Sequence, residues 1–473
     1  MWPLLEAAVF RLTGVSLAAA RALTVVVFGV TLLAVYGLIT RSERLSRPHG
    51  ARGGIAFAAP LALLFLAASP FFFAFERIAI LEPLLGALTL LAMLCALYIG
   101  EPPPPGTPLR SRQRSCIPSL ALGLLLLAMI LTKPTAIALL PAVFFLLWAR
   151  AGYRLQQALR LVFPPVLLGG SLWLAYYLLL VRPHFLEDYR YLFSANEYTG
   201  FQTEPLAGVV FHTVAYGAWM GTALYVLFFA LMLFLLFRRP RFFRNPLPTA
   251  LLLWVAGYFL FLGYHNNPQS RYYLLLALPV TLLVPLALED LRHPRRGASS
   301  TPRFRLLRPA LVGAAVLTVV LPDAIEQFGF LRHPTYTFFN AAQAIARRVR
   351  AEPAHSPLVL SVSGSDLTLM TGLPSINTEF GTLDLDQRIR QYRPGWYLAW
   401  NEIEDEDMKA IAPFYQPTLV ASYPAMDDPD RNLLLLYRLD PPNPNAAPHP
   451  YRRGPRHPRF GKHPEAGHHG MSF

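Results

Sequence analysis

The chain has 473 residues, of which 54% are hydrophobic and 15% are charged. Soluble domains carry about 25% charged residues, so this composition excludes an ordinary soluble protein and indicates a chain that lies largely in a bilayer. The formal net charge of +14 would also suit a nucleic-acid partner. The arginines, however, stand in short clusters between apolar blocks, which is typical of the cytoplasmic loops of membrane proteins. We therefore expect membrane lipids, and no nucleic acid, as partners.

The apolar runs predict membrane-spanning helices, because each of them approaches the ~20 residues that a bilayer requires. The run 117–148 is longer and is interrupted by Thr132-Lys133-Pro134-Thr135. Since a lysine at mid-bilayer is costly, we expect two short helices that meet at this break on one membrane face. With these two, the sequence predicts a polytopic α-helical membrane protein of about ten segments. The other runs cover residues 17–40, 53–73, 78–100, 158–181, 207–237, 247–265, 272–289 and 307–322.

Alternation of these segments across the bilayer places every arginine cluster on the same side. The clusters fall within residues 41–52, 110–114, 150–160, 238–244 and 292–308. The positive-inside rule makes that side cytoplasmic, so we expect a multi-pass protein of the bacterial inner membrane with an extracytoplasmic C-terminal third. The same alternation puts Met1 outside with no segment to export it. We therefore expect that an N-terminal helix and the first external loop are missing from this chain.

The C-terminal third predicts a small α/β domain over residues 323–440, separate from a membrane domain over residues 1–322. Strands are expected at 358–362, 396–400, 418–422 and 433–437, and helices at 336–351, 383–391 and 404–413. This alternation is typical of an α/β layer. Ser363-Gly364-Ser365-Asp366 follows the first strand and is a weak candidate for the start of a ligand-binding helix. Residues 441–473, rich in Pro, His and Arg, predict a disordered basic tail.

Polar residues gather on the expected external face of the membrane domain. Glu76 and Arg77 stand in a tight turn between two segments, and Glu82 lies about one turn inside the next helix. A carboxyl group there faces the bundle or a water-filled cavity, or is protonated. Glu82 is thus either a structural carboxylate that snorkels or pairs with arginine, or a binding or catalytic acid. We favour the second interpretation, because Lys133 and Arg271 share its face.

Lys133 is the only lysine in residues 1–322. A lone cation beside a broken helix suits a phosphate, and the alternative is an interfacial anchor. Arg271 stands at the outer mouth of a helix, followed by Tyr272 and Tyr273. The two tyrosines belong either to an aromatic belt or to a site where they stack on a sugar or flank a phosphate. The sequence contains no phosphate-binding loop, zinc pattern or nucleophile elbow, so it defines no cofactor and no metal ligand and leaves a divalent metal open.

These motifs resemble those of the GT-C glycosyltransferases, in particular the bacterial branch related to protein O-mannosyltransferases and lipid A aminoarabinose transferase. Their order along roughly residues 1–290 carries the resemblance, and the Glu82 position is usually an aspartate in the family. The matching pieces are Trp2-Pro3-Leu4, Phe10-Arg11-Leu12-Thr13-Gly14, Ser69-Pro70, Glu76-Arg77 with Glu82, Leu131-Thr132-Lys133-Pro134 and Ser270-Arg271-Tyr272.

The resemblance implies inverting transfer of a sugar from a polyprenyl-phosphate donor to a lipid, glycan or protein acceptor at the outer leaflet. It further implies that Lys133 and Arg271 hold the donor phosphate, and that the substrate cavity includes Glu76, Arg77, Tyr272 and Tyr273. The catalytic aspartate of the family lies in a first external loop that this chain does not contain. The catalytic residue is therefore unassigned, and Glu82 is the candidate.

Two alternatives to an enzyme remain open from the sequence. A non-catalytic relative would bind lipid-linked sugar without transferring it. A transporter of lipid-linked substrate would often show an internal repeat with paired broken helices, whereas this sequence has one break and no repeat. A general base must reach the proton of the acceptor, so the fate of the missing loop separates the enzyme from the binder.

Overall fold

The structure, a computed structural model, describes residues 1–46, 57–99, 109–194, 206–264, 269–292, 302–379, 383–401, 405–428 and 431–442. The chain divides into two compact units. Unit 1 comprises Met1–Leu12 and Ala20–Leu331, and unit 2 comprises Thr13–Ala19 and Arg332–Phe473. Apart from its first two residues, the expected tail 441–473 lies outside the described residues. The three-domain division at residues 322 and 440 stays a prediction.

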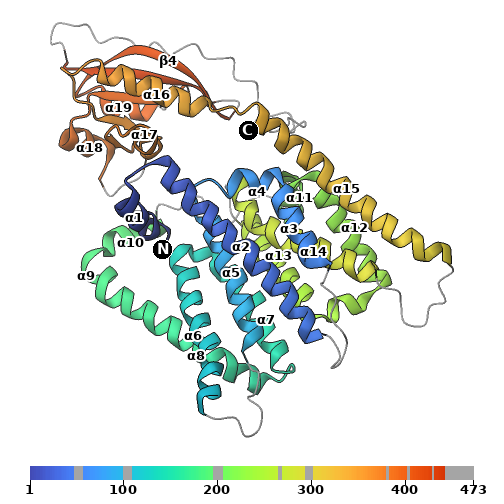
Figure 1. Cartoon of the computed structure of the whole chain (residues 1–473). Coiled ribbons are helices and arrows are strands. Elements are labelled where there is room, and N and C mark those ends of the chain that lie inside the picture. Colours follow the sequence, from blue (N-terminus) through green and yellow to red (C-terminus); the bar gives the residue numbers. More distant parts are fainter. Residues whose placement is uncertain are drawn as a thin grey trace. The chain divides into compact units, whose positions relative to one another are not determined.

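Unit 1 is helical throughout the part that the structure describes (Figure 1). Six described helices are long and apolar enough to cross a membrane, and further apolar helices are shorter. This confirms a polytopic helical membrane protein, while the number of about ten segments stays a prediction. The elements are α1 (Trp2–Thr13), α2 (Leu17–Ser46), α3 (Ala58–Ala68), α4 (Pro70–Phe75), α5 (Leu81–Tyr98), α6 (Leu109–Thr132), the 3-10 turn η1 (Pro134–Leu139), α7 (Leu140–Arg150), α8 (Leu155–Tyr176), the π-turn η2 (Tyr177–Val181), α9 (Arg182–His184), α10 (Leu186–Ser194), α11 (Leu206–Tyr216), η3 (Gly217–Met220), α12 (Thr222–Arg238), η4 (Pro240–Arg244), α13 (Pro246–Tyr264), η5 (Ser270–Tyr273), α14 (Leu274–Arg292) and α15 (Pro302–Arg332).

The breaks between helices follow from particular residues. The expected break in 117–148 is present, because Pro134 cannot donate the next helical hydrogen bond and α6 ends at Thr132. The expectation of a single span over 207–237 was wrong. Two helices occupy this run, α11 and α12, separated by η3 and by Gly221. The φ of Gly221 is +104°, a backbone conformation that favours glycine and that no α-helix contains.

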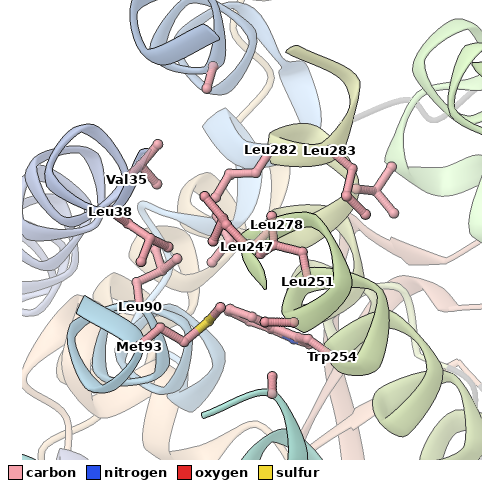
Figure 2. Close-up of a cluster of buried hydrophobic side chains, with 14 of the residues drawn as sticks. Val35, Leu38, Leu90, Met93, Leu247, Leu251, Trp254, Leu278, Leu282 and Leu283 are labelled. Carbon is pink, nitrogen blue, oxygen red and sulfur yellow. The ribbon is translucent and has the colours of Figure 1, made fainter. Parts of the chain in front are cut away.

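The core of unit 1 forms where α2, α5, α13 and α14 meet. Figure 2 shows side chains of these four helices pointing toward one another, and all of those labelled are at least nine-tenths buried. Gly86 of α5 lies against the side chain of Leu278 in α14, so that a Cβ at this position would come within 3.1 Å of it. This packing fixes the first turn of α5 relative to the start of α14. The labelled residues are Val35, Leu38, Leu90, Met93, Leu247, Leu251, Trp254, Leu278, Leu282 and Leu283.

A second close contact joins α13 to η1. The Cα of Gly257 approaches the backbone carbonyl of Ala138 so closely that a Cβ would collide with it. A glycine is therefore required there for the two backbones to pack. Because Tyr258 follows Gly257 and Lys133 precedes η1, this contact also brings these two residues to the same region of the bundle.

Unit 2 is a five-stranded mixed sheet covered on both faces by helices (Figure 1). The strand order is β2-β1-β3-β5-β4, parallel among the first three strands and antiparallel among the last three. The strands are β1 (Val359–Ser361), β2 (Ser375–Ile376), β3 (Trp396–Trp400), β4 (Gln416–Asp428) and β5 (Arg431–Asp440), and the helices are α16 (Thr337–Arg350), α17 (Gly364–Thr371), α18 (Leu385–Tyr392) and α19 (Asp405–Ile411).

Strand β3 shows why the sheet is covered twice. Trp396, Leu398 and Trp400 pack with α16 and α17, whereas the alternate residues Tyr397 and Ala399 pack with α18 and α19. A strand with both faces buried has a continuous apolar sequence, as Trp396–Trp400 has. The expected strands and helices are present, α17 begins where Ser363-Gly364-Ser365-Asp366 was a candidate for a helix start, and β2 is additional. The small α/β domain is thus confirmed.

Candidate functional site

The first turn of α5 carries a buried acid. Glu82 lies two residues after Ile80, the N-cap of α5, and its side chain is 4% exposed. The N-terminal end of a helix carries partial positive charge from unpaired backbone N–H groups, which stabilises a carboxylate there. The helix therefore supplies part of the stabilisation that burial would otherwise remove from a charged Glu82.

Lys133 lies just beyond the C-terminal end of α6, whereas Glu82 lies at the N-terminal end of α5. It directly follows Thr132, the last residue of α6, and stands before Pro134 in an extended conformation, with φ −157° and ψ 127°. A proline excludes the helical region for the residue before it, so the turn is set by the sequence. The C-terminal end of α6 carries partial negative charge, which favours a cation.

These two helix ends meet in a short ion pair. The Nζ of Lys133 lies 2.6 Å from Oε1 of Glu82, and the lysine side chain is 16% exposed. The two residues are 51 positions apart in the chain, so the tertiary fold and not the local sequence creates the pair. Removing one partner of a buried pair typically costs about 3–5 kcal/mol, because the other charge is left uncompensated.

Tyr272 joins the ion pair to a second cation. Lys133 Nζ lies 4.1 Å from the centroid of the Tyr272 ring, and the guanidinium carbon of Arg271 lies 5.2 Å from the same centroid. Cation–π contacts of this kind contribute about 0.5–2 kcal/mol each, depending on burial. A Nη2 atom of Arg271 is also 3.5 Å from the Tyr272 hydroxyl. Within the described part of the chain, the buried Nε of Arg271 has no hydrogen-bond partner.

Tyr258, a residue that the sequence did not single out, lies near Glu82. Tyr258 of α13 is fully buried and interacts electrostatically with Glu82 and Tyr272. Its hydroxyl neighbours that of Thr135 in η1, but among the described residues neither hydroxyl makes a hydrogen bond of good geometry. A tyrosine inside an apolar run gives no sequence signal of a site. The close contact of Gly257 with Ala138 holds α13 against η1, and so brings Tyr258 close to the segment that follows Lys133.

Glu76 and Arg77 stand in the turn before α5. Glu76 is 5% exposed, and its Oε2 has no hydrogen-bond partner among the described residues. Burial raises the pKa of Glu76 from its ordinary value of 4.5 to about 8. Arg77 lies over the rings of Phe73 and Phe330, at 4.3 and 4.8 Å from their centroids.

Tyr273 points away from the cluster formed by Glu82, Lys133, Arg271 and Tyr272. It is fully buried, its hydroxyl donates to the carbonyl of Thr213 at 3.1 Å, and its ring packs edge-on against Trp219. Consecutive residues of a 3-10 helix such as η5 point about 120° apart, so Tyr272 and Tyr273 face different surroundings. In this structure Tyr273 anchors α11, and its place in a substrate cavity stays a prediction.

The cluster can hold an anion but offers no evident metal cage. It combines two cations with one carboxylate at the ends of helices. Among the residues that the structure describes, no group of three or more His, Cys, Asp or Glu side chains is arranged to hold a metal ion. A negatively charged headgroup that lies beside apolar helices is the ligand this arrangement fits.

Comparisons with known proteins bear on the fold. No protein-family model and no curated sequence matches the chain. Among solved structures it is similar to ArnT from Cupriavidus metallidurans bound to undecaprenyl phosphate, with 16% identity and a TM-score of 0.59 over 93% of this chain and 88% of that one. It is also similar to the oligosaccharyltransferase of Archaeoglobus fulgidus in complex with Zn and sulfate, with 13% identity and a TM-score of 0.50 over 93% of this chain and 64% of that one. Both are GT-C glycosyltransferases, so the chain has the GT-C fold that its motifs suggested.

Proposed function

We propose that this chain transfers a sugar from a polyprenyl-phosphate donor to a lipid, glycan or protein acceptor. The observation that carries the proposal is the cluster of Glu82, Lys133, Arg271 and Tyr272 at one end of a helical bundle with the GT-C fold. The similar ArnT structure is bound to undecaprenyl phosphate, which supports the class of donor.

In the proposed complex, Lys133 and Arg271 hold the phosphate while the polyprenyl chain lies against apolar helices. Arg271 is suited to the first contact, since its Nε donor is unsatisfied within the described residues and a guanidinium matches phosphate geometry. Charge-assisted hydrogen bonds contribute about 1.5–3 kcal/mol each. Tyr272 keeps the two cations in place through its ring.

The reaction itself requires a base and a stabilised leaving group. A general base takes the proton of the acceptor hydroxyl, the oxygen attacks the anomeric carbon, and the bond to the phosphate oxygen breaks. Negative charge then develops on the departing polyprenyl phosphate, where Lys133 and Arg271 would stabilise it. Glu82 is the candidate base of this chain.

We propose that the cluster faces outward from a bacterial inner membrane, with the C-terminal domain on the same side. Phe330, close to the end of α15, contacts Arg77 and Phe73 in unit 1. The chain therefore leaves α15 near the end of the bundle that carries Glu76 and Arg77. The arginine clusters fall in loops that the alternation of the segments assigns to the other side, which the positive-inside rule would make cytoplasmic.

Cysteine labelling tests this orientation. Ser46→Cys and Ser365→Cys, both at exposed positions, would be introduced one at a time into a chain without Cys95 and Cys116. A membrane-impermeant thiol reagent added to intact cells is expected to label position 365 and not position 46. The opposite pattern would overturn the proposed orientation.

A transfer assay tests the activity. Membranes that contain the chain are supplied with a polyprenyl-phosphate-linked radiolabelled sugar, and the label that leaves the donor is measured. Loss of a general base lowers rates by about 10²–10⁴-fold, so Glu82→Gln should abolish measurable transfer. Arg241→Ala, which removes an exposed arginine of η4, is the matched control and should leave it unchanged.

A non-catalytic binder of lipid-linked sugar is the second candidate. It is favoured by the ion pair itself, because a carboxylate neutralised by Lys133 at 2.6 Å is not available as a base. The two functions share the donor site and differ in turnover. Donor binding without any transfer by the wild-type chain would favour the binder.

A further inference from the structure

The ion pair poses a chemical problem for the proposed donor site. Lys133 is the cation expected to bind phosphate, yet it already contacts Glu82 at 2.6 Å. A phosphate that draws Lys133 away would leave the carboxylate of Glu82 buried without its counter-ion. An uncompensated buried charge is strongly unfavourable and would cancel much of the gain from the new contact.

The structure contains a donor that could take over. The hydroxyl of Tyr258 is buried and interacts electrostatically with Glu82, and it neighbours the buried hydroxyl of Thr135. Among the described residues neither has a well-formed hydrogen bond, and buried hydroxyls in proteins are normally satisfied. An unsatisfied hydroxyl of Tyr258 near the Glu82 carboxylate indicates a second arrangement of the site in which this hydroxyl is used.

We infer that Tyr258 is a positioning residue that hydrogen-bonds to the carboxylate of Glu82 when an anionic headgroup draws Lys133 away. The inference rests on the proposed function, because it takes a polyprenyl phosphate as the headgroup. In the free protein, Glu82 is held by Lys133. In the complex, the lysine holds the phosphate and the Tyr258 hydroxyl donates to Glu82.

This exchange of partners keeps every charge compensated in both states. The Lys133 ammonium group gains an oxygen of the phosphate, and the Glu82 carboxylate gains the hydroxyl of Tyr258. Released from Lys133, Glu82 would face the donor as a free carboxylate, which is the state a general base requires.

A double-mutant cycle tests the exchange, because it isolates the coupling between two residues. The affinity of the full chain in nanodiscs for undecaprenyl phosphate is measured for the wild type, Tyr258→Phe, Glu82→Gln and the double variant. A hydrogen bond to a charged group justifies an expected weakening of about tenfold for Tyr258→Phe in the wild-type background. With Glu82→Gln, where no charge needs a new partner, Tyr258→Phe should change the affinity less than about twofold.

The controls separate this inference from the proposed function. Tyr225→Phe also removes a half-buried tyrosine hydroxyl, one that donates to Val214 at 2.8 Å, and should leave the affinity unchanged. Equal weakening by Tyr258→Phe in both backgrounds, or none in either, would overturn the inference and leave the donor site intact. Absence of binding by the wild type would overturn the proposed function and the inference with it. If Tyr258→Phe is not recovered folded, Tyr258→Met, which also removes the hydroxyl and keeps a large apolar side chain, gives the same comparison in the same two backgrounds.

Discussion

The turn before α5 and the first turn of α5 each bury one glutamate, and the two acids differ in how they are accommodated. Glu82 is compensated by the N-terminal end of its helix and by Lys133 at 2.6 Å. Glu76 lies outside the helix, has an oxygen without a partner among the described residues, and has a pKa raised to about 8. The two buried acids therefore have different surroundings, because Glu82 lies at the start of α5 and beside Lys133.

The largest effect on stability is expected from removing one of the two charges of the Lys133–Glu82 ion pair. Lys133→Met leaves Glu82 buried without its counter-ion and should lower the free energy of unfolding by about 3–5 kcal/mol. The double variant Lys133→Met with Glu82→Gln removes both charges and should recover most of that loss. Thermal unfolding midpoints in detergent would measure both. A double variant as unstable as the single one would mean that packing, and not charge, accounts for the loss.

A smaller effect is expected from replacing Tyr272, whose ring contacts both Lys133 and Arg271. Tyr272→Leu removes both cation–π contacts and keeps an apolar side chain, so stability should fall by about 1–2 kcal/mol. Tyr272→Phe retains a ring and should lose much less. Unfolding midpoints of the two variants give the comparison, and equal losses would show that the hydroxyl is the important group.

The smallest effect at neutral pH is expected at Glu76. Because its pKa is about 8, this acid is mostly protonated at pH 7, and Glu76→Gln replaces one neutral side chain by another. Between pH 4.5 and about 8, Glu76 is protonated in the folded protein but ionised in the unfolded chain. The wild type should therefore lose stability as pH rises through this range, whereas Glu76→Gln should not share that part of the loss. Parallel pH profiles for the two proteins would contradict the assignment.

The sequence predicted only some of the features that distinguish the surroundings of Glu76 from those of Glu82. It identified Glu76, Glu82, Lys133 and Arg271, because charged residues at the ends of apolar runs are conspicuous. It also predicted the end of α6, since Pro134 dictates it locally. It did not predict which charges pair, because the contact between Glu82 and Lys133 spans 51 positions and depends on how α5 and α6 pack.

Other features could not have been predicted because their cause is tertiary. Tyr258 looks like a core residue in its apolar run, and only the packing of α13 against η1 brings it close to the segment that follows Lys133. The break at Gly221 lies inside an uninterrupted apolar run, and glycine is common in membrane helices. Tyr273 was placed with its neighbour Tyr272 by proximity in the sequence, although the helical turn separates their side chains.

The most direct test of the central claim compares the affinity of the chain for undecaprenyl phosphate with its affinity for undecaprenol, which lacks the phosphate. The account predicts that the wild type prefers the phosphate, and that Lys133→Ala and Arg271→Ala each weaken its binding about tenfold or more without changing the binding of undecaprenol. Arg241→Ala should retain the preference. Equal affinity of the wild type for both lipids, or an undiminished affinity for the phosphate in both site variants, would contradict a donor-phosphate site at Lys133 and Arg271.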